Sequence, residues 1–166
     1  MTNFFIKTDL SRKDAENIVS DTLNNCDDGE LFLENSKSES IILDDEKIKS
    51  SSYSSDLGYG LRAVTGEVIA YSHSNEISKN SLKQSAKNIN STLKSKKGVY
   101  NQEIPKTNEK FYKDVNPIEK KTLDSKLELL KEINNYTRSK GTIVKQVTAS
   151  LTGEHKSIEI IRCGGE

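Results

Sequence analysis

The residue types that most often bind metals or act as nucleophiles are few in this sequence. Its 166 residues include two histidines, His73 and His155, and two cysteines, Cys26 and Cys163. A zinc site needs three or four such side chains that converge on one point. No Cys-x-x-Cys spacing, nucleophile elbow or Walker loop is present. The sequence therefore predicts no metal ligand and no catalytic residue.

Three consecutive acids, Asp44, Asp45 and Glu46, raise the question of a cation site. Carboxylates can bind a hard cation, but acids grouped between two apolar runs are far more typical of a solvated hairpin turn. We therefore predict a solvated turn here.

The stretch DLGYGLRAVTGEVIAYSHS, residues 56–74, contains glycines that could form a phosphate-binding loop. Such a loop needs a helix directly after its glycines, because free backbone N–H groups and the helix dipole bind the anion. Here GYG is followed by LRAV and a turn at Thr65 and Gly66, which is typical of a strand. Gly58 and Gly60 then share one face of that strand, and we expect a helix or another backbone to pack closely there.

Arg62 falls on the same face as the two glycines. The main prediction is a structural ion pair with a buried carboxylate such as Asp56. The alternative is that its guanidinium reaches a partner chain or a peptide main chain.

Composition excludes several classes of function. Hydrophobic residues make up 33% of the chain, and 25 basic residues balance 25 acidic ones. Zero net charge argues against nucleic acid or an anionic membrane as partner. The basic run KSKKG, residues 94–98, has no aromatic residues between its lysines, so we predict no nucleic-acid binding there. No apolar segment approaches the roughly 20 residues of a membrane span, so a cytoplasmic protein is expected.

The two cysteines fit this location. They are far apart in sequence, which indicates a reducing compartment, and each is predicted to be a small buried apolar residue.

Hydrophobic periodicity predicts the elements. A helix is expected from Ser11 to about Asn25, followed by a turn at residues 27–29. Period-two runs at 31–34, 40–43, 47–55, 59–64 and 67–73 predict a four-stranded antiparallel meander. A second helix is expected within 75–93.

The remainder of the chain predicts a long connection at 95–117 and a third helix between Pro117 and Gly141. The apolar stripe of this helix is expected to comprise Leu123, Leu127, Leu130 and Ile133. Two more strands should follow, around a turn at 152–155. The fold class is α+β: a largely antiparallel sheet with about three helices packed on it.

These motifs, taken together, resemble the amino-terminal half of the TldD/PmbA family of bacterial metallopeptidases, once described as modulators of DNA gyrase. The resemblance extends through VNPIEKK (115–121), the helix with KLELLKEI (126–133) and KQVTASLTG (145–153). The amino-acid sequence of these motifs favours the TldD branch of the family. The residues of the glycine region that carry it are Ser52, Tyr53, Asp56, Gly58, Gly60, Arg62, Ala63, Gly66 and Glu67.

The family implies a zinc-dependent peptidase that works as a heterodimer with a PmbA (TldE)-like subunit and cuts flexible or unfolded peptides. Its zinc ligands come from a His-Glu-x-x-x-His helix and a later cysteine in the carboxy-terminal domain. No such motif occurs between Met1 and Glu166, and Cys163 ends a different context, IEIIRC. The resemblance therefore implies that residues 1–166 are a single amino-terminal domain of a longer protein, with the catalytic domain and its zinc absent.

The expected role of such a domain is to form subunit interface and substrate-cleft wall, without activity of its own. The alternative is a stand-alone protein-binding module. Gyrase or nucleic-acid association is disfavoured by the zero net charge.

A serine-rich run predicts where a partner could bind. It is expected to form a sheet edge whose free N–H and C=O groups pair with the partner subunit or an extended substrate. The competing interpretation is a plain solvated edge. The run comprises Ser50, Ser51, Ser52, Tyr53, Ser54 and Ser55.

Overall fold

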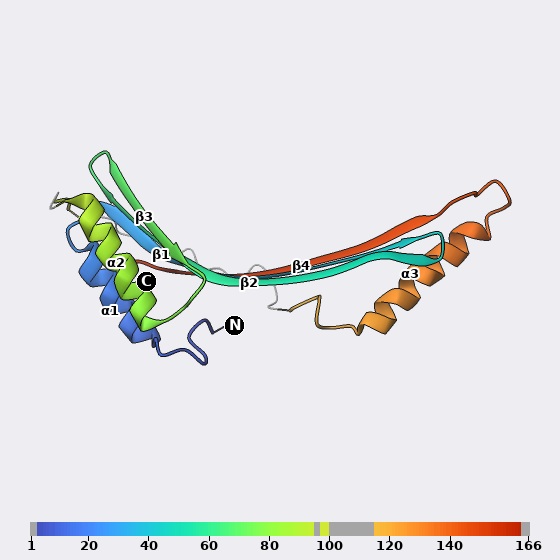
Figure 1. Ribbon diagram of the computed structural model, residues 1–166, viewed down its shortest axis with the longest axis horizontal. Coiled ribbons are helices and arrows are strands. Elements are labelled where there is room, and N and C mark those ends of the chain that lie inside the picture. The colour runs from blue at the N-terminus through green and yellow to red at the C-terminus, as the bar shows by residue number, and fades with distance from the viewer. Residues whose placement is uncertain (1–2, 95–96, 100–114, 164–166) are drawn as a thin grey trace. The chain divides into compact units, whose positions relative to one another are not determined.

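A computed structural model describes residues 3–94, 97–99 and 115–163 of the chain. Within these residues a four-stranded antiparallel sheet has the order β3-β2-β1-β4 (Figure 1). The helices are α1 (Arg12–Leu23), α2 (Lys79–Leu93) and α3 (Leu123–Arg138). The strands are β1 (Asp28–Asp44), β2 (Lys47–Thr65), β3 (Val68–Ser74) and β4 (Thr148–Ile161). The predicted α+β class is confirmed.

The chain divides into two compact units, which are described separately below. Unit 1 comprises Met1–Asn35, Asp56–Tyr112 and Ser157–Glu166, and unit 2 comprises Ser36–Ser55 and Lys113–Lys156. Strands β1, β2 and β4 therefore each contribute residues to both units.

Unit 1 is a helix pair packed on a sheet face. Helices α1 and α2 lie side by side (Figure 1). Alternate strand residues point toward them, as expected for a sheet with one buried face. Each fully buried aliphatic side chain contributes about 1.5–3 kcal/mol. The core includes Ala15, Val19, Leu23, Leu31, Leu33, Leu61, Ala63, Ala70, Leu82, Ile89 and Ile161.

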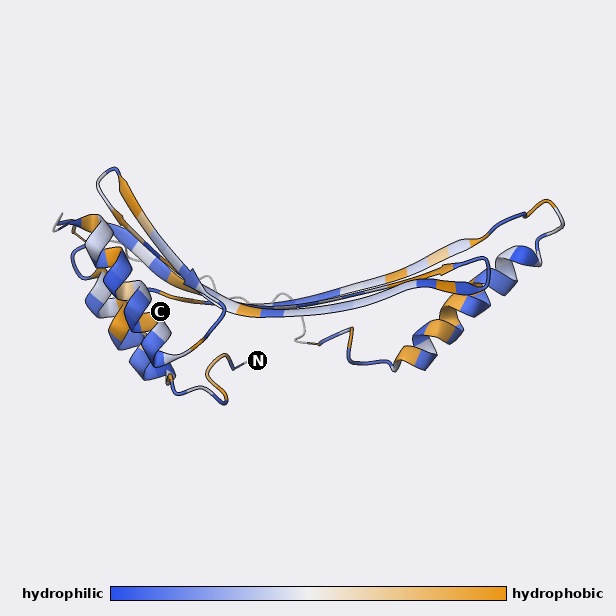
Figure 2. Ribbon diagram, in the orientation of Figure 1, coloured by the Kyte–Doolittle hydropathy of each residue, from blue (hydrophilic) through white to orange (hydrophobic). Residues whose placement is uncertain are grey.

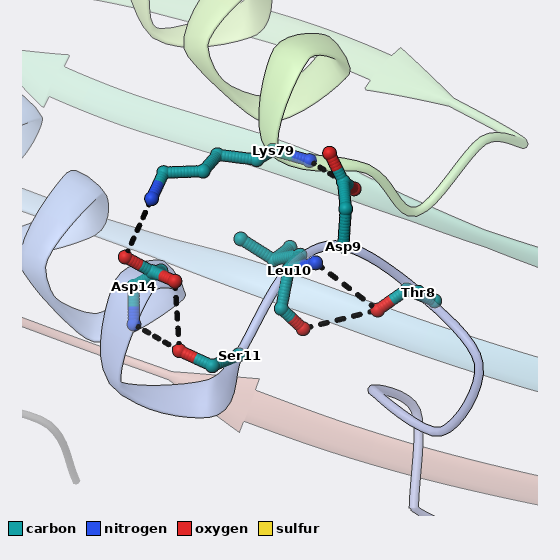
Figure 3. Close-up of polar contacts among 6 residues, drawn as sticks. All are labelled: Thr8, Asp9, Leu10, Ser11, Asp14 and Lys79. Atoms are coloured by element: carbon teal, nitrogen blue, oxygen red, sulfur yellow. Dashed lines mark hydrogen bonds and ion pairs between the residues drawn. The ribbon is translucent and has the colours of Figure 1, made fainter.

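The first turns of α1 and α2 are joined by polar contacts (Figure 3). Ser11 caps α1, as predicted, because its Oγ accepts a hydrogen bond from the Asp14 amide at 3.1 Å. The Lys79 ammonium donates to Asp14 at 2.9 Å, and the Lys79 amide donates to Asp9 at 3.0 Å. The hydrogen bond from Lys79, followed by that from Ser11, lowers the pKa of Asp14.

Unit 2 has a small core beneath α3. Leu130 packs with Ile41 and Leu43 of β1 and with Ala149 of β4. The buried ammonium of Lys126 contacts Glu39 at 2.7 Å and donates to the carbonyl of Ile118 at 2.7 Å. The side chains of Lys126 and Glu39 are 7% and 13% exposed, so this ion pair is part of the core of unit 2.

The segment before α3 differs from its prediction. Helix α3 begins at Leu123 and not directly after Pro117. Thr122 is its N-cap, because the Thr122 hydroxyl accepts a hydrogen bond from the Ser125 amide. Of the intervening residues, Ile118 packs on the sheet, and residues 119–122 are exposed. Ile118 is 5% exposed, and its Cγ1 would lie 3.3 Å from a Cβ placed on Gly153. A glycine in β4 thus makes room for a buried isoleucine.

The predicted stripe of α3 is partly wrong. Leu130 is buried and Leu127 is half-buried, but Leu123 is 51% and Ile133 is 43% exposed. The buried positions are Lys126, Leu130 and Asn134. Because Lys126 is neutralised by Glu39, a charged residue occupies a position that periodicity assigns to an apolar one.

Several predicted strand breaks are absent. Residues 31–34 and 40–43 belong to one strand, β1, and the serine-rich and glycine-rich runs form one strand, β2. No turn occurs at 152–155, since β4 is continuous. Asp28 and Gly29 begin β1 and do not form a turn. Backbone pairing with neighbouring strands continues through these polar residues, and the hydroxyls of Ser38 on β1 and Ser54 on β2 lie 2.9 Å apart.

The outcome for the other elements is mixed. Helix α1 ends at Leu23. Helix α2 lies within the predicted range 75–93 and buries Leu82, Ile89 and Leu93. The meander comprises β1, β2 and β3, with β4 beside β1. Of the predicted long connection, residues 95–96 and 100–114 lie outside the described part of the chain.

Candidate functional site

The Asp-x-Gly-x-Gly-x-Arg motif lies along β2, and Gly66 lies in the turn after it. Arg62 projects toward β1, where its Nη2 donates to Asp28 at 2.6 Å and its Nε lies 3.5 Å from Glu30. The predicted structural ion pair is therefore present, but its carboxylates are Asp28 and Glu30. Asp56 was the wrong candidate: its side chain is exposed.

A second guanidinium completes this charge cluster. Nη2 of Arg162 lies 3.6 Å from Glu30. The hydrogen bond that Arg62 donates to Asp28 raises the pKa of Arg62, so the guanidinium stays charged. Two carboxylates and two guanidiniums balance each other, and because the Arg62 side chain is 34% exposed, each pair is worth at most about 1 kcal/mol. The cluster fixes strands; it has no reacting group.

The two motif glycines permit close contacts of different kinds. A Cβ on Gly58 would lie 2.8 Å from the carbonyl oxygen of Ser74, which is the backbone approach that the sequence predicted. A Cβ on Gly60 would lie 2.5 Å from the hydroxyl of Tyr71. The neighbour of Gly60 is thus the side chain of Tyr71 on β3, and not a helix.

Gly66 has a positional role that involves Asp27. Its φ of +57° suits the first central residue of the two-residue loop between Thr65 and Val68. Its amide donates to Asp27 at 2.6 Å, and the other carboxylate oxygen accepts the Val99 amide at 2.9 Å. These two backbone hydrogen bonds lower the pKa of Asp27. One carboxylate therefore links the hairpin turn to residues 97–99.

Sequence reasoning missed Asp27, Gly98 and Gly29 as packing positions. A Cβ on Gly98 would lie 2.7 Å from the Asp27 amide nitrogen, and one on Gly29 would lie 2.6 Å from the Arg62 carbonyl oxygen. An Asp among turn residues is a signal for accepted backbone N–H groups and could have pointed to Asp27. The requirement for the two glycines arises from contacts distant in sequence.

A buried hydroxyl network was missed as well. The Tyr59 hydroxyl lies 2.9 Å from the hydroxyls of both Ser81 and Ser85, and Ser72 donates to Ser85 at 3.1 Å. The network joins β2, β3 and α2. Serines next to apolar residues in the predicted second helix were the available signal.

The acidic triplet forms the β1–β2 turn, as predicted, but its carboxylates are bonded within the protein. Asp44 accepts from Thr148 at 2.7 Å and from Gln146 at 3.0 Å, and these hydrogen bonds lower its pKa. Arg138 pairs with both Asp45 and Glu46. The triplet thus anchors the turn to neighbouring segments of unit 2.

The serine-rich run, Ser50–Ser55, is exposed throughout. The pairing of β2 with β3 covers residues 59–65 only, so the run lies beyond the end of β3. One residue of the run, Ser52, lines a shallow hollow. The hollow is lined by Ser38, Glu39, Ser40, Ser52, Thr152, Gly153 and Glu154.

The described residues do not provide a zinc centre. Among them, no group of three or more His, Cys, Asp or Glu side chains is placed to hold a metal ion. His73 belongs to unit 1 and His155 to unit 2. The donor set therefore does not fit the metal that the family resemblance implies.

Both cysteines are free thiols. Cys26 is buried, as predicted, and burial raises its pKa, whereas Cys163 is only half-buried. In the described part of the chain no helix is long and apolar enough to cross a membrane.

Comparisons with known proteins give one consistent family. Residues 29–91 match the family described as PmbA/TldA metallopeptidase domain 1. A metalloprotease TldD homolog of Buchnera aphidicola (subspecies Acyrthosiphon pisum) is 37% identical over 84% of this chain and 29% of its own length. Its counterpart in Haemophilus influenzae is 31% identical over 85% of this chain and 30% of its own length. The chain thus spans about a third of the length of these relatives.

Two solved structures share the fold. One, described as a modulator of DNA gyrase from Bacteroides thetaiotaomicron, has a TM-score of 0.61 at 18% identity, over 88% of this chain and 38% of that one. The other is TldE from Thermococcus kodakarensis, with a TM-score of 0.56 at 13% identity, over 89% of this chain and 34% of that one. These two structures show the fold. The family model and the TldD homologs show that the chain belongs to the TldD/PmbA family and matches its amino-terminal domain.

Proposed function

We propose that this chain is the non-catalytic amino-terminal domain of a TldD-like zinc metallopeptidase that cleaves flexible or unfolded peptides in the cytoplasm. One observation carries the proposal: relatives named metalloproteases align with nearly all of this chain, yet it covers about a third of their length. The described residues also lack a metal-binding cluster. Zinc and the catalytic residues would belong to the rest of such a protein.

Within that protein, the domain would contribute subunit interface and substrate-cleft wall. The exposed run Ser50–Ser55 extends past β3, so its main-chain groups are candidates for strand addition. Hydrogen bonds to a peptide backbone are indifferent to side chains, which suits an enzyme that accepts many sequences. The expected occupant is an extended peptide or a strand of a PmbA (TldE)-like subunit.

The first test measures metal and activity on the tag-free chain. We expect no stoichiometric zinc by elemental analysis and no cleavage of an unfolded substrate such as casein. One tightly held zinc per chain would contradict the proposal, because it would require a ligand set that the described residues lack.

The second test addresses the edge. Amide hydrogen exchange is measured on a TldD-like protein containing this domain, alone, with its PmbA-like subunit and with an inhibitory peptide. Residues 50–55 should gain protection in at least one complex. If they gain none, the run is a solvated edge and the docking role is wrong, while the family assignment stands.

A stand-alone protein-binding module is the second candidate. Helix α3 carries hydrophobic residues among hydrophilic ones (Figure 2). Two exposed apolar residues and one exposed tyrosine recur at i, i+4 and i+7 on α3, which places them on one helix face. Leu129, Ile133 and Tyr136 are 44%, 43% and 66% exposed. The reading frame downstream of residue 166 distinguishes the candidates, because a His-Glu-x-x-x-His helix encoded there favours the peptidase.

A further inference from the structure

Strand β3 is an edge of the sheet in unit 1. The order β3-β2-β1-β4 gives it one neighbour, and the antiparallel register pairs Val68–Ser74 with Tyr59–Thr65 of β2. No other strand lies beside it among the described residues. Its outer main-chain groups are therefore available to a further strand.

The hairpin register identifies those groups. A two-residue loop is closed by a hydrogen-bonded pair, here Thr65 and Val68, and hydrogen-bonded pairs then alternate along the ladder. Ala70 and Ser72 thus bond to β2. The N–H and C=O groups of Ile69, Tyr71 and His73 point the other way, toward the open edge.

The same three residues have exposed side chains that leave the edge accessible. Ile69 is 65% and Tyr71 is 64% exposed. The Tyr71 ring turns inward across Gly60 of β2 and stacks on His73, with ring centroids 5.8 Å apart. The ring therefore covers the sheet face and not the edge.

Strand β3 also lacks the charged residues and prolines that protect many edge strands. Its sequence, VIAYSHS, contains no Lys, Arg, Asp, Glu or Pro. The opposite edge strand, β4, carries Glu154, Lys156 and Glu159. Charges on an edge oppose strand addition, so β4 is protected and β3 is not.

We propose that β3 pairs antiparallel with β3 of a second copy of this chain, about a two-fold axis at Tyr71. This inference does not depend on the peptidase assignment. Such symmetric pairing brings identical residues of the two copies near each other. Charged residues would therefore repel their own equivalents, whereas a strand without charges meets no such repulsion. Tyr71 then lies opposite its own equivalent, and Ile69 lies opposite His73 of the second copy. All three outward N–H groups of each strand find carbonyl partners.

The test combines sedimentation equilibrium with residue-resolved hydrogen exchange on the 166-residue chain. We expect a concentration-dependent dimer in which the amides of Ile69, Tyr71 and His73 become protected as concentration rises. The amides of Ala70 and Ser72 should be protected at every concentration, because they bond to β2. A chain that stays monomeric, or a dimer whose outward β3 amides remain unprotected, overturns the proposal.

A matched pair of variants tests which edge is used. Ile69→Lys should weaken the dimer at least about tenfold, since lysine is a typical protecting residue of edge strands. Ile158→Lys on β4 replaces another exposed isoleucine, 50% exposed, and should leave the dimer unchanged. Equal weakening by both variants overturns the proposal. Circular dichroism checks that each variant folds, and the exchange pattern of the unmodified chain decides the question if one does not.

Discussion

The two units are stabilised in different ways. In unit 1, α1 and α2 bury a continuous set of aliphatic side chains from β1, β2 and β3. In unit 2, α3 buries Leu130 but also Lys126 and Asn134, and the buried apolar cluster is small. Hydrophobic burial is non-directional, whereas a buried ion pair depends on each partner being in place. The stability of unit 2 should therefore be more sensitive than that of unit 1 to the replacement of a single buried polar residue.

The largest expected effect comes from Lys126→Met. It leaves the Glu39 carboxylate buried without its counter-charge, which typically costs about 3–5 kcal/mol. Urea unfolding should show the loss, and hydrogen exchange should place it in unit 2. The control is Lys37→Met, which removes an exposed pair with Glu119 and should cost less than about 1 kcal/mol. Adding Glu39→Leu to Lys126→Met should recover stability, and failure to recover would show that the cost arises from packing.

The stability of unit 1 should decrease most when a substitution adds side-chain volume at a closely packed position. Gly58→Ala should cost about 1–3 kcal/mol, because its methyl group would meet the backbone of Ser74. Gly60→Ala should cost less, since the obstructing atoms belong to the exposed ring of Tyr71, which can turn away. Thermal unfolding of the two variants checks the order. Equal effects would mean that the Tyr71 ring is fixed over the strand.

The same contrast explains what the sequence could predict. Periodicity located α1 and α2 because their buried residues are apolar, and Ser11 marked the start of α1. Periodicity misplaced the start of α3 and its stripe because Ile118 packs on Gly153 and Lys126 pairs with Glu39, which are contacts between residues far apart in the sequence. The strand breaks predicted within β1, β2 and β4 were wrong for a related reason. Polar residues that resemble turns in one strand are part of a continuous sheet, in which each strand is hydrogen-bonded to its neighbouring strands.

The candidate site was predictable only in part. Arg62 could be assigned to an ion pair from its residue type, but its partners, Asp28 and Glu30, lie on another strand, and an alternating pattern does not identify which strands are neighbours. The packing role of Gly58 followed from its spacing. An Asp among turn residues indicates a carboxylate that accepts backbone N–H groups, but the sequence does not show that the donors to Asp27 are Gly66 and Val99.

The smallest expected effects are on acid stability, and they too differ between the units. Hydrogen bonds lower the pKa of Asp27 in unit 1 and of Asp44 in unit 2 below the unfolded value. A lowered folded pKa stabilises the protein above the unfolded value of about 3.9, and this contribution is lost as pH falls through the folded pKa. Asp44→Asn should therefore make unit 2 less sensitive to acid and leave the acid response of unit 1 unchanged. Hydrogen exchange, corrected for intrinsic rates and followed from neutral to acid pH in both proteins, measures each unit separately. An equal change in both units would show that they unfold together and that the contrast between them is one of local contacts only.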